Sequence, residues 1–291
     1  MVTDAHGFHI ITRPAYHDKA VEIARQDPEK LLADAAPPGP MQGRGSRLVL
    51  PGESGETILI KKARRGGLYG KLRGDIHRSD RQALAEVIIS EHAWKKGVPV
   101  GLLAFAMSAD AGPGKLASYR RAYSAAIMVP GARSLMEWLT SPLSEGQRRG
   151  VLAAAAAAAR RAHDCGLTHG DLTLGNILVT CSEQGEFNAI LIDLTHSRLG
   201  RVLVHKPRLA NLVRLYRSAQ KWLPEPDTRR RQREIVRFLR VYTKGERGET
   251  RRFLKSAAGH RGSLFLHRLS WRIGGGPAGR VRRRSTAPAG R

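Results

Sequence analysis

Two short apolar runs, each next to acidic or amide side chains, constrain the fold of this chain more than any other feature. The stretch "LTHGDLTLGNILV" (167–179) places a His, an Asp and an Asn directly ahead of Ile-Leu-Val, and "AILIDLTHSRL" (189–199) ends a second run on Asp193. Short apolar runs on either side of a polar turn are typical of a β-hairpin. The sequence therefore predicts a hairpin with an amide just before its first strand and a carboxylate just after its second.

The rest of the chain alternates strand and helix patterns. A Gly-containing turn joins two apolar runs into a second predicted hairpin, and a Ser-x-x-Gln start with a seven-alanine run favours a long helix. The predicted elements are the hairpin "SRLVL"/"ETILIKK", a short helix in "DPEKLLADAA", a helix over 79–96, a strand to Val129, a short helix from Arg133, a long helix over 143–164 and an amphipathic helix from Arg208.

This order of elements predicts an α+β fold with the two-lobed layout of a protein kinase. We expect residues 1–40 to form an N-terminal extension and residues 41–130 a β-rich first lobe. Residues 131–255 would then form a mainly helical second lobe, and residues 256–291 a basic, disordered tail.

The polar residues of these two stretches, 167–179 and 189–199, are of the types that phosphoryl transfer requires. In that reaction the protein orients a hydroxyl, holds metal ions and neutralises phosphate charge. Asp171 can accept the hydroxyl proton as a base, and the oxygens of Asn176 and Asp193 are hard ligands of the kind that Mg²⁺ prefers. Taken singly, each could instead cap a turn or satisfy loop backbone, as Asp and Asn often do. Their joint order, each beside a predicted strand, favours a site for ATP and Mg²⁺.

Such a site also needs a lysine for the nucleotide phosphates and a glutamate to hold that lysine. Lys61 and Lys62 lie on opposite faces of one predicted strand, and Lys61 shares its face with Leu59. We therefore favour Lys61, and for Lys62 we expect a solvated strand end. The following helix carries Glu86 and Glu91, of which Glu86 lies nearer the middle and on the apolar stripe. Lys61 and Glu86 form the predicted pair.

Glycines precede the first predicted strand of this region. Gly43 and Gly45 of "GRGS" could cover phosphates with backbone N–H groups, although a plain turn uses the same residues.

Charge and cysteine content narrow the possible partners. The chain carries a formal charge of +25, and residues 228–291 hold 19 Lys or Arg against 3 Glu, an excess of 16. Such a charge attracts phosphate-rich partners such as an anionic membrane surface, although a solvated basic face has the same composition. The two cysteines form no metal or disulfide pattern, which favours a reducing cytoplasm. The first residues of the given sequence do not resemble a signal peptide, and no apolar run is long enough to span a bilayer.

The motifs resemble those of the bacterial lipopolysaccharide kinases, the Kdo kinase and core heptose kinase group of the protein-kinase-like fold. The resemblance runs from about Gly43 to Lys221, and its more particular motifs are "RRGGL" and "GVPV". It implies Lys61 and Glu86 as the phosphate-contacting pair, Asp171 as the base and Asn176 and Asp193 as Mg²⁺ ligands. Other motifs that carry it are "THGDLTLGNILV", "LIDLTHSRL", "VPGARSLMEWL" and "NLVRLYRS".

One motif departs from the family pattern. Relatives typically read Asp-Phe-Asp or Asp-Phe-Gly where this chain reads Asp193-Leu194-Thr195. Leu194 can pack as the Phe would, but Thr195 replaces an acidic or flexible residue.

The resemblance, together with two protein-kinase features that the sequence lacks, indicates the substrate class. Thr173 stands where Ser/Thr protein kinases usually place a Lys, and no Ala-Pro-Glu motif follows Asp193. We expect transfer of the γ-phosphoryl group of ATP to a sugar hydroxyl, of Kdo or heptose, in the lipopolysaccharide inner core or a lipid A precursor. The site of action would be the cytoplasmic face of the inner membrane. The alternatives are an atypical Ser/Thr protein kinase and a non-catalytic basic scaffold; only 5% of the residues are aromatic, which argues against nucleic acid.

Overall fold

The computed structural model describes residues 1–35, 47–52, 55–63, 81–112, 119–223 and 228–259. The chain divides into two compact units, and each unit collects segments from distant parts of the sequence. The first unit comprises Met1–Gly131, Cys165–Gly170 and Leu191–Arg201, and the second comprises Ala132–Asp164, Asp171–Ile190 and Val202–Arg291.

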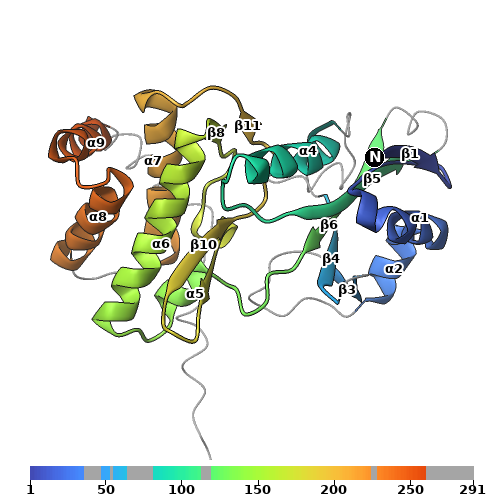
Figure 1. The fold of residues 1–291 in the computed structure, drawn as a ribbon, viewed down its shortest axis with the longest axis horizontal. Helices are drawn as coiled ribbons and strands as arrows, with labels where there is room; N and C mark the ends of the chain where they lie inside the picture. The colour runs from blue at the N-terminus through green and yellow to red at the C-terminus, as the bar shows by residue number, and fades with distance from the viewer. Residues whose placement is uncertain (36–46, 53–54, 64–80, 113–118, 224–227, 260–291) are drawn as a thin grey trace, which may run out of the picture. The chain divides into compact units, whose positions relative to one another are not determined.

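An antiparallel six-stranded sheet forms the centre of the first unit (Figure 1). The hairpin predicted from "SRLVL" and "ETILIKK" is confirmed, with Leu48 opposite Ile60 in its register. In spatial order the strands are β1 (Val2–Ala5), β2 (Phe8–Thr12), β5 (Leu103–Asp110), β6 (Arg120–Ile127), β4 (Thr57–Lys62) and β3 (Arg47–Pro51).

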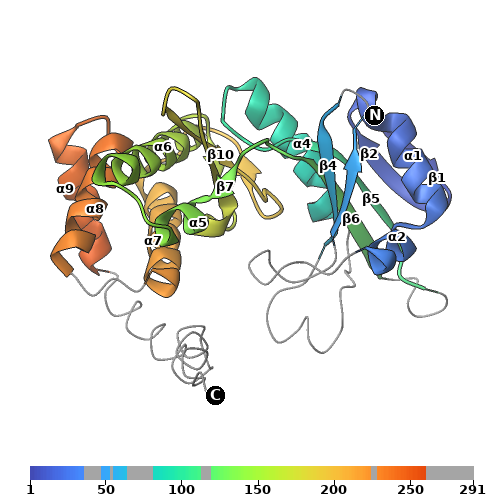
Figure 2. The same cartoon turned by 90° about the horizontal axis from the view of Figure 1, so that it is seen from below.

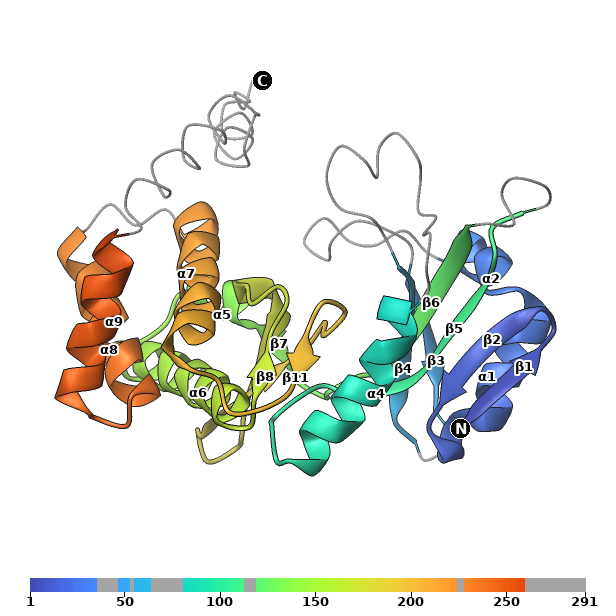
Figure 3. The same cartoon turned by 90° about the horizontal axis from the view of Figure 1, so that it is seen from above.

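Helices cover both faces of this sheet. Helices α1 (His17–Gln26) and α2 (Pro28–Asp34) lie on one face and α4 (Arg81–Lys95) on the other (Figures 2 and 3). Because successive residues of a strand point to opposite faces, each strand contributes to both layers. The larger core, under α1 and α2, includes Ile10, Ile58, Ile60, Phe105 and Tyr123, and the smaller core, under α4, includes Leu84, Val87, Leu103 and Ala106.

The beginning of the chain differs from the expectation. Residues 1–40 were predicted to form a separate extension with one short helix, whereas β2 pairs with β5 in the main sheet. Phe8 and Ile10 are buried in the larger core, which fixes the hairpin β1–β2 to the first unit. The predicted short helix is present as α2, but α1 and both strands were missed.

Two very short strands complete the first unit. Strand β8 (Leu167–Thr168) pairs antiparallel with β11 (Arg198–Leu199). This pairing joins the segment directly before His169 to the segment that follows the Asp193 turn.

The second unit is mainly helical, with a small three-stranded sheet (Figure 1). The hairpin predicted between Asn176 and Asp193 is confirmed as β9 and β10. Strand β7 pairs with β9. The bounds are β7 (Arg133–Ser134), α5 (Leu135–Thr140), α6 (Glu145–Asp164), β9 (Ile177–Cys181), β10 (Phe187–Leu191), α7 (His205–Trp222), α8 (Thr228–Tyr242) and α9 (Arg247–Gly259).

Helix α6 organises this unit. Its predicted start is confirmed, because Ser144 Oγ accepts from the Gln147 N–H at 3.1 Å and the Ser144 N–H donates to Gln147 Oε1 at 3.0 Å. Near its far end, the buried ring of His163 contacts Tyr242 Oη at 2.7 Å and Asn211 Oδ1 at 3.1 Å. Burial raises the pKa of the Tyr242 hydroxyl to about 12. These bonds join α6 to α7 and to the end of α8.

Helices α8 and α9 were not predicted, since the sequence analysis named no helix after residue 223. Arginines surround only a few apolar positions in α8, but Leu239 and Tyr242 are buried. Helix α9 continues to Gly259, past the expected start of the tail at residue 256. Residues 260–291 lie outside the described part of the chain.

Candidate functional site

The loop that contains His169 is held by hydrogen bonds to the segment after β10. His169 is 1% exposed, and its Nε2 lies 3.0 Å from the carbonyl oxygen of Ile192, to which it donates. The neighbouring Gly170 N–H donates to Ser197 Oγ at 3.1 Å. A Cβ on Gly170 would lie 2.3 Å from His196 Cβ, so the close approach of the two segments requires glycine. His169 therefore fixes the loop and does not itself point to solvent.

Asp171 and Asn176 lie close together in the second unit. The Asn176 Nδ2 donates to the backbone carbonyl of Asp171 at 2.8 Å. This bond uses the nitrogen of the amide, so Oδ1 is the atom left to accept a ligand. The loop is also tied to α7, because the Leu174 N–H donates to Ser218 Oγ at 3.1 Å. Both predicted residues thus belong to one hydrogen-bonded loop.

A residue that the sequence analysis did not select lies beside Asp171. Nη1 of Arg214, on α7, is 3.3 Å from Oδ1 of Asp171, and the two side chains are 50% and 53% exposed. Arg214 lies in the quoted motif "NLVRLYRS", but its distance from Asp171 in sequence concealed the contact.

Asp193 lies in a tight turn that Glu86 holds. Asp193 has a φ of 61°, a backbone conformation that residues other than glycine rarely adopt. The Leu194 N–H donates to Oε1 of Glu86 at 2.8 Å. Thr195 Oγ1 lies 2.8 Å from Oε2 of Glu86 and 2.8 Å from Oδ1 of Asp193. Both carboxylate oxygens of Glu86 therefore contact the turn that carries Asp193.

Glu86 is a buried acid in the middle of this arrangement. Its residue is 4% exposed, and burial raises the pKa of its carboxyl above the ordinary value. The positive charge of Lys61 opposes this shift of the pKa, and the negative charge of Asp193 adds to it. Lys61 is therefore near enough to act on Glu86 electrostatically. Within the described residues, however, the direct partners of Glu86 are Leu194 and Thr195.

The two strand lysines have separate environments, as their alternation predicts. Lys62 forms an ion pair with Glu29 of α2, with 2.6 Å between Nζ and Oε1. It is thus engaged in the α1–α2 layer, which differs from the solvated strand end that was expected. Lys61 pairs in register with Ser124, on the face that α4 covers. The predicted lysine therefore lies on the same side of the sheet as Glu86.

The structure thus forms two clusters, one in each unit. The first contains Glu86, Asp193 and Thr195 with Lys61 nearby, and the second contains Asp171, Asn176 and Arg214. Gly43 and Gly45, the predicted phosphate-covering residues, lie outside the described residues.

The atoms present fit a magnesium ion held jointly with a nucleotide. No group of three or more His, Cys, Asp or Glu side chains in the described ranges could hold a metal ion. Mg²⁺ keeps several waters and commonly takes only one or two protein ligands when phosphates supply the rest. Asn176 Oδ1 and Asp193 Oδ2 are hard oxygens that make no hydrogen bond to the part of the chain described, so each can serve as such a ligand.

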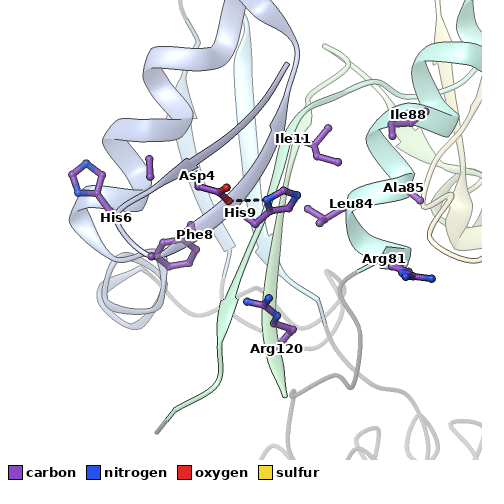
Figure 4. Close-up of a pocket in the computed structure, with 12 residues that line it drawn as sticks. Asp4, His6, Phe8, His9, Ile11, Arg81, Leu84, Ala85, Ile88 and Arg120 are labelled. Atoms are coloured by element: carbon purple, nitrogen blue, oxygen red, sulfur yellow. Dashed lines mark hydrogen bonds and ion pairs between the residues drawn. The ribbon is translucent and has the colours of Figure 1, made fainter. Parts of the chain in front are cut away.

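A separate hollow lies at the edge of the first unit. It has a volume of about 840 Å³ between the β1–β2 hairpin and α4, and its walls include Phe8, Leu84 and Arg81. Figure 4 shows His9 directed at Asp4 among the lining residues, and Nδ1 of His9 lies 2.8 Å from Oδ1 of Asp4. Of the predicted site residues that the structure describes, none lines this hollow. Of the helices described, none is both long and apolar enough to cross a membrane.

Comparisons with known proteins agree with the fold and the motifs. A curated 3-deoxy-D-manno-octulosonic acid kinase of Haemophilus influenzae (strain PittEE) is 28% identical over 192 residues, which cover 63% of this chain and 75% of that protein. A solved structure, "WaaP in complex with acyl carrier protein", aligns with a TM-score of 0.53 and 16% identity, covering 89% of this chain and 97% of that one. This likeness confirms the kinase-like α+β fold.

The family model of the lipopolysaccharide kinase (Kdo/WaaP) family matches residues 42–242. That match covers most of the chain, including both clusters and the Asp-Leu-Thr turn. The chain therefore belongs to the lipopolysaccharide kinase (Kdo/WaaP) family.

Proposed function

We propose that this protein transfers the γ-phosphoryl group of ATP to a hydroxyl of Kdo in the inner core of lipopolysaccharide, with a core heptose as the other candidate acceptor. Family membership supports lipopolysaccharide kinase activity and, with it, a phosphotransferase that uses ATP. Kdo is favoured because the curated relative is a Kdo kinase. The observation that carries the proposal is the Asp171–Asn176 loop, in which the Asn176 side-chain nitrogen donates to the Asp171 carbonyl and so holds the carboxylate residue beside the amide residue.

Asp171 is proposed as the base. Its side chain is 53% exposed, so an acceptor hydroxyl can reach it, and Arg214 restrains the direction of its carboxylate. A carboxylate in this role orients the attacking hydroxyl and accepts its proton as the new oxygen–phosphorus bond forms, while the bond from the γ-phosphorus to the bridging oxygen breaks and ADP leaves.

Asn176 and Asp193 are proposed to hold Mg²⁺, which would neutralise charge on the phosphates. Lys61 is proposed to contact the nucleotide phosphates, and the buried Glu86 to hold the turn that presents Asp193. Gly43 and Gly45 are proposed to cover the phosphates with backbone N–H groups.

The basic helices of the second unit support a peripheral position at an anionic membrane surface. Their exposed side chains would add to the attraction by about 1 kcal/mol each near such a surface. The exposed cations of α8, α9 and the turn between them include Arg233, Arg240, Lys244, Arg247, Arg251, Arg252 and Lys255. The same charge suits an acidic protein, and the structural neighbour was solved with an acyl carrier protein, so such a carrier is a second candidate partner.

An acceptor panel tests the proposed function. The purified protein is incubated with radiolabelled ATP, Mg²⁺ and either Kdo-lipid A, a heptose-containing core, lipid A without Kdo or a general protein substrate. The proposal predicts label in Kdo-lipid A and none in lipid A. Label in the protein substrate alone would support an atypical protein kinase. No transfer, together with steeply salt-dependent nucleic-acid binding, would support a non-catalytic scaffold.

A further inference from the structure

The Asp193–Thr195 turn contains a side chain to which the proposed function gives no role. The Thr195 hydroxyl lies 2.8 Å from an oxygen of each of two carboxyl groups. One of them, on Glu86, is buried on α4, and the other, on Asp193, belongs to the turn itself.

The chemistry of a hydroxyl suits this position. A threonine hydroxyl donates one hydrogen bond and accepts two, whereas an ionised carboxylate only accepts. With its single hydrogen, Thr195 donates to one carboxylate at a time, and it joins both when one carboxyl group is protonated and donates to the threonine oxygen. A glycine here would leave both without this partner, and an aspartate would bring a third carboxyl group against Glu86.

The turn has two further restraints, one of which is a hydrogen bond to Glu86. The Leu194 N–H donates to the other oxygen of Glu86, and the Leu194 side chain is 1% exposed. The Ser197 N–H donates to the Leu194 carbonyl at 2.9 Å, which closes the turn. The backbone is thus anchored at Leu194, and among the residues that the structure describes, the Thr195 hydroxyl is the group that connects that anchor to the Asp193 carboxylate. A strained φ at Asp193 makes such a restraint useful, because the surrounding structure must over-determine the conformation.

We propose that Thr195 is a positioning residue: its hydroxyl links the Asp193 carboxylate to the buried Glu86 and directs the other Asp193 oxygen, Oδ2, toward the bound magnesium. This inference rests on the proposed function, in which Asp193 is a magnesium ligand. Thr195 itself touches neither the metal nor the acceptor.

The test compares Thr195→Val, which keeps the shape but removes the hydroxyl, with Thr195→Ser, which keeps the hydroxyl. Calorimetric titration with ADP is run with and without Mg²⁺, alongside phosphoryl transfer to Kdo-lipid A. We expect T195V to weaken magnesium-dependent ADP binding about tenfold, the range for residues that orient a metal ligand, and to leave metal-free ADP binding unchanged. T195S should stay within about twofold of the wild type.

A matched control is Thr180→Val on β9, whose hydroxyl makes only a 3.5 Å contact with the Asn188 carbonyl. It should bind Mg²⁺ and ADP as the wild type does. If T195V does not fold, as judged by circular dichroism, Thr195→Ala removes the same hydroxyl without a second methyl group and gives the same comparison.

Three results would overturn the inference: unchanged magnesium-dependent binding in T195V, an equal loss in T195S, or an equal loss with and without Mg²⁺. Failure of the proposed function looks different. In that case the wild type would transfer no phosphate to any sugar acceptor, while the calorimetric difference between T195V and T195S could still be present.

Discussion

Arg214 of α7 lies 3.3 Å from Asp171, the proposed base, although 43 residues separate them in the chain. Both side chains are about half exposed, so this ion pair contributes little to stability, of the order of 0.5 kcal/mol. We propose that it restrains the direction of the Asp171 carboxylate in the solvent-exposed loop.

Replacing Arg214 should therefore affect activity far more than folding. We expect Arg214→Ala to lower kcat/KM for Kdo-lipid A about tenfold, because a misdirected base loses part of its orientation advantage. Arg214→Lys should recover part of this loss. Chemical denaturation should show less than about 1 kcal/mol of destabilisation for either variant. Normal kcat/KM in R214A would show that the pair has no part in the reaction.

The predictable parts of the site are local in sequence, and the parts that were missed depend on distant contacts. Asp171 and Asn176 are five residues apart, so their spacing alone places them in one loop. The bond between Leu194 and Glu86 spans 108 residues, and no periodicity reports such a contact.

The same distinction between local patterns and distant contacts explains which strands and helices were predicted. The hairpin of β3 and β4 has a turn signal and alternating burial, and it was predicted. Strand β5 is buried at seven consecutive positions, Leu103–Ala109, so it lacks the alternation that identifies a half-buried strand. The charge of α8 concealed its buried face.

Two glycines between β8 and β9 should respond very differently to alanine. A Cβ on Gly170 would meet the backbone of His196 at 2.4 Å, whereas on Gly175 the nearest atom is Thr173 Oγ1 at 3.9 Å. We expect Gly170→Ala to destabilise the protein by about 1–3 kcal/mol, as overpacking does, and to lower activity. Gly175→Ala serves as the matched control and should fold normally. Equal melting temperatures for the two variants would contradict the close approach of the two segments.

The ion pair between Arg148 of α6 and Glu234 of α8 should be important for stability. The two side chains are 11% and 16% exposed, and Arg148 also donates to the Leu139 carbonyl. We expect Arg148→Ala to cost about 2 kcal/mol in urea denaturation, because the Glu234 carboxylate loses its nearer cation and keeps Arg230, 3.6 Å away and more exposed. The double variant Arg148→Met, Glu234→Leu should be more stable than R148A. Additive losses in the double variant would show that the two residues are not coupled.

Asp164 at the end of α6 should make stability depend on acid pH. Burial would raise the pKa of its carboxyl, but hydrogen bonds and charges from Arg160 and Arg208 outweigh burial and hold the pKa below the ordinary 3.8. A lowered pKa in the folded state means that stability is fully present above the unfolded value and is lost as pH falls through the folded one. Urea denaturation from pH 6 to pH 2 should therefore show a smaller loss of stability in Asp164→Asn than in the wild type. Parallel curves would contradict this assignment.

Asn176 offers a test of the proposed metal ligands. In Asn176→Ala we expect the Mg²⁺ concentration for half-maximal activity to rise at least about tenfold, because an oxygen ligand is lost. Thr173→Ala, in the same loop, should leave this concentration unchanged. A loss in N176A that excess Mg²⁺ does not relieve would instead assign Asn176 to loop structure, through its bond to Asp171.

The most direct test of the proposed reaction is the rate of phosphate transfer from ATP to Kdo-lipid A by the wild type and by Asp171→Asn. The account predicts transfer by the wild type and a rate about 10²- to 10⁴-fold lower in D171N, with binding of Mg²⁺ and ATP retained, since only the base is lost. Equal rates in the two proteins would contradict it.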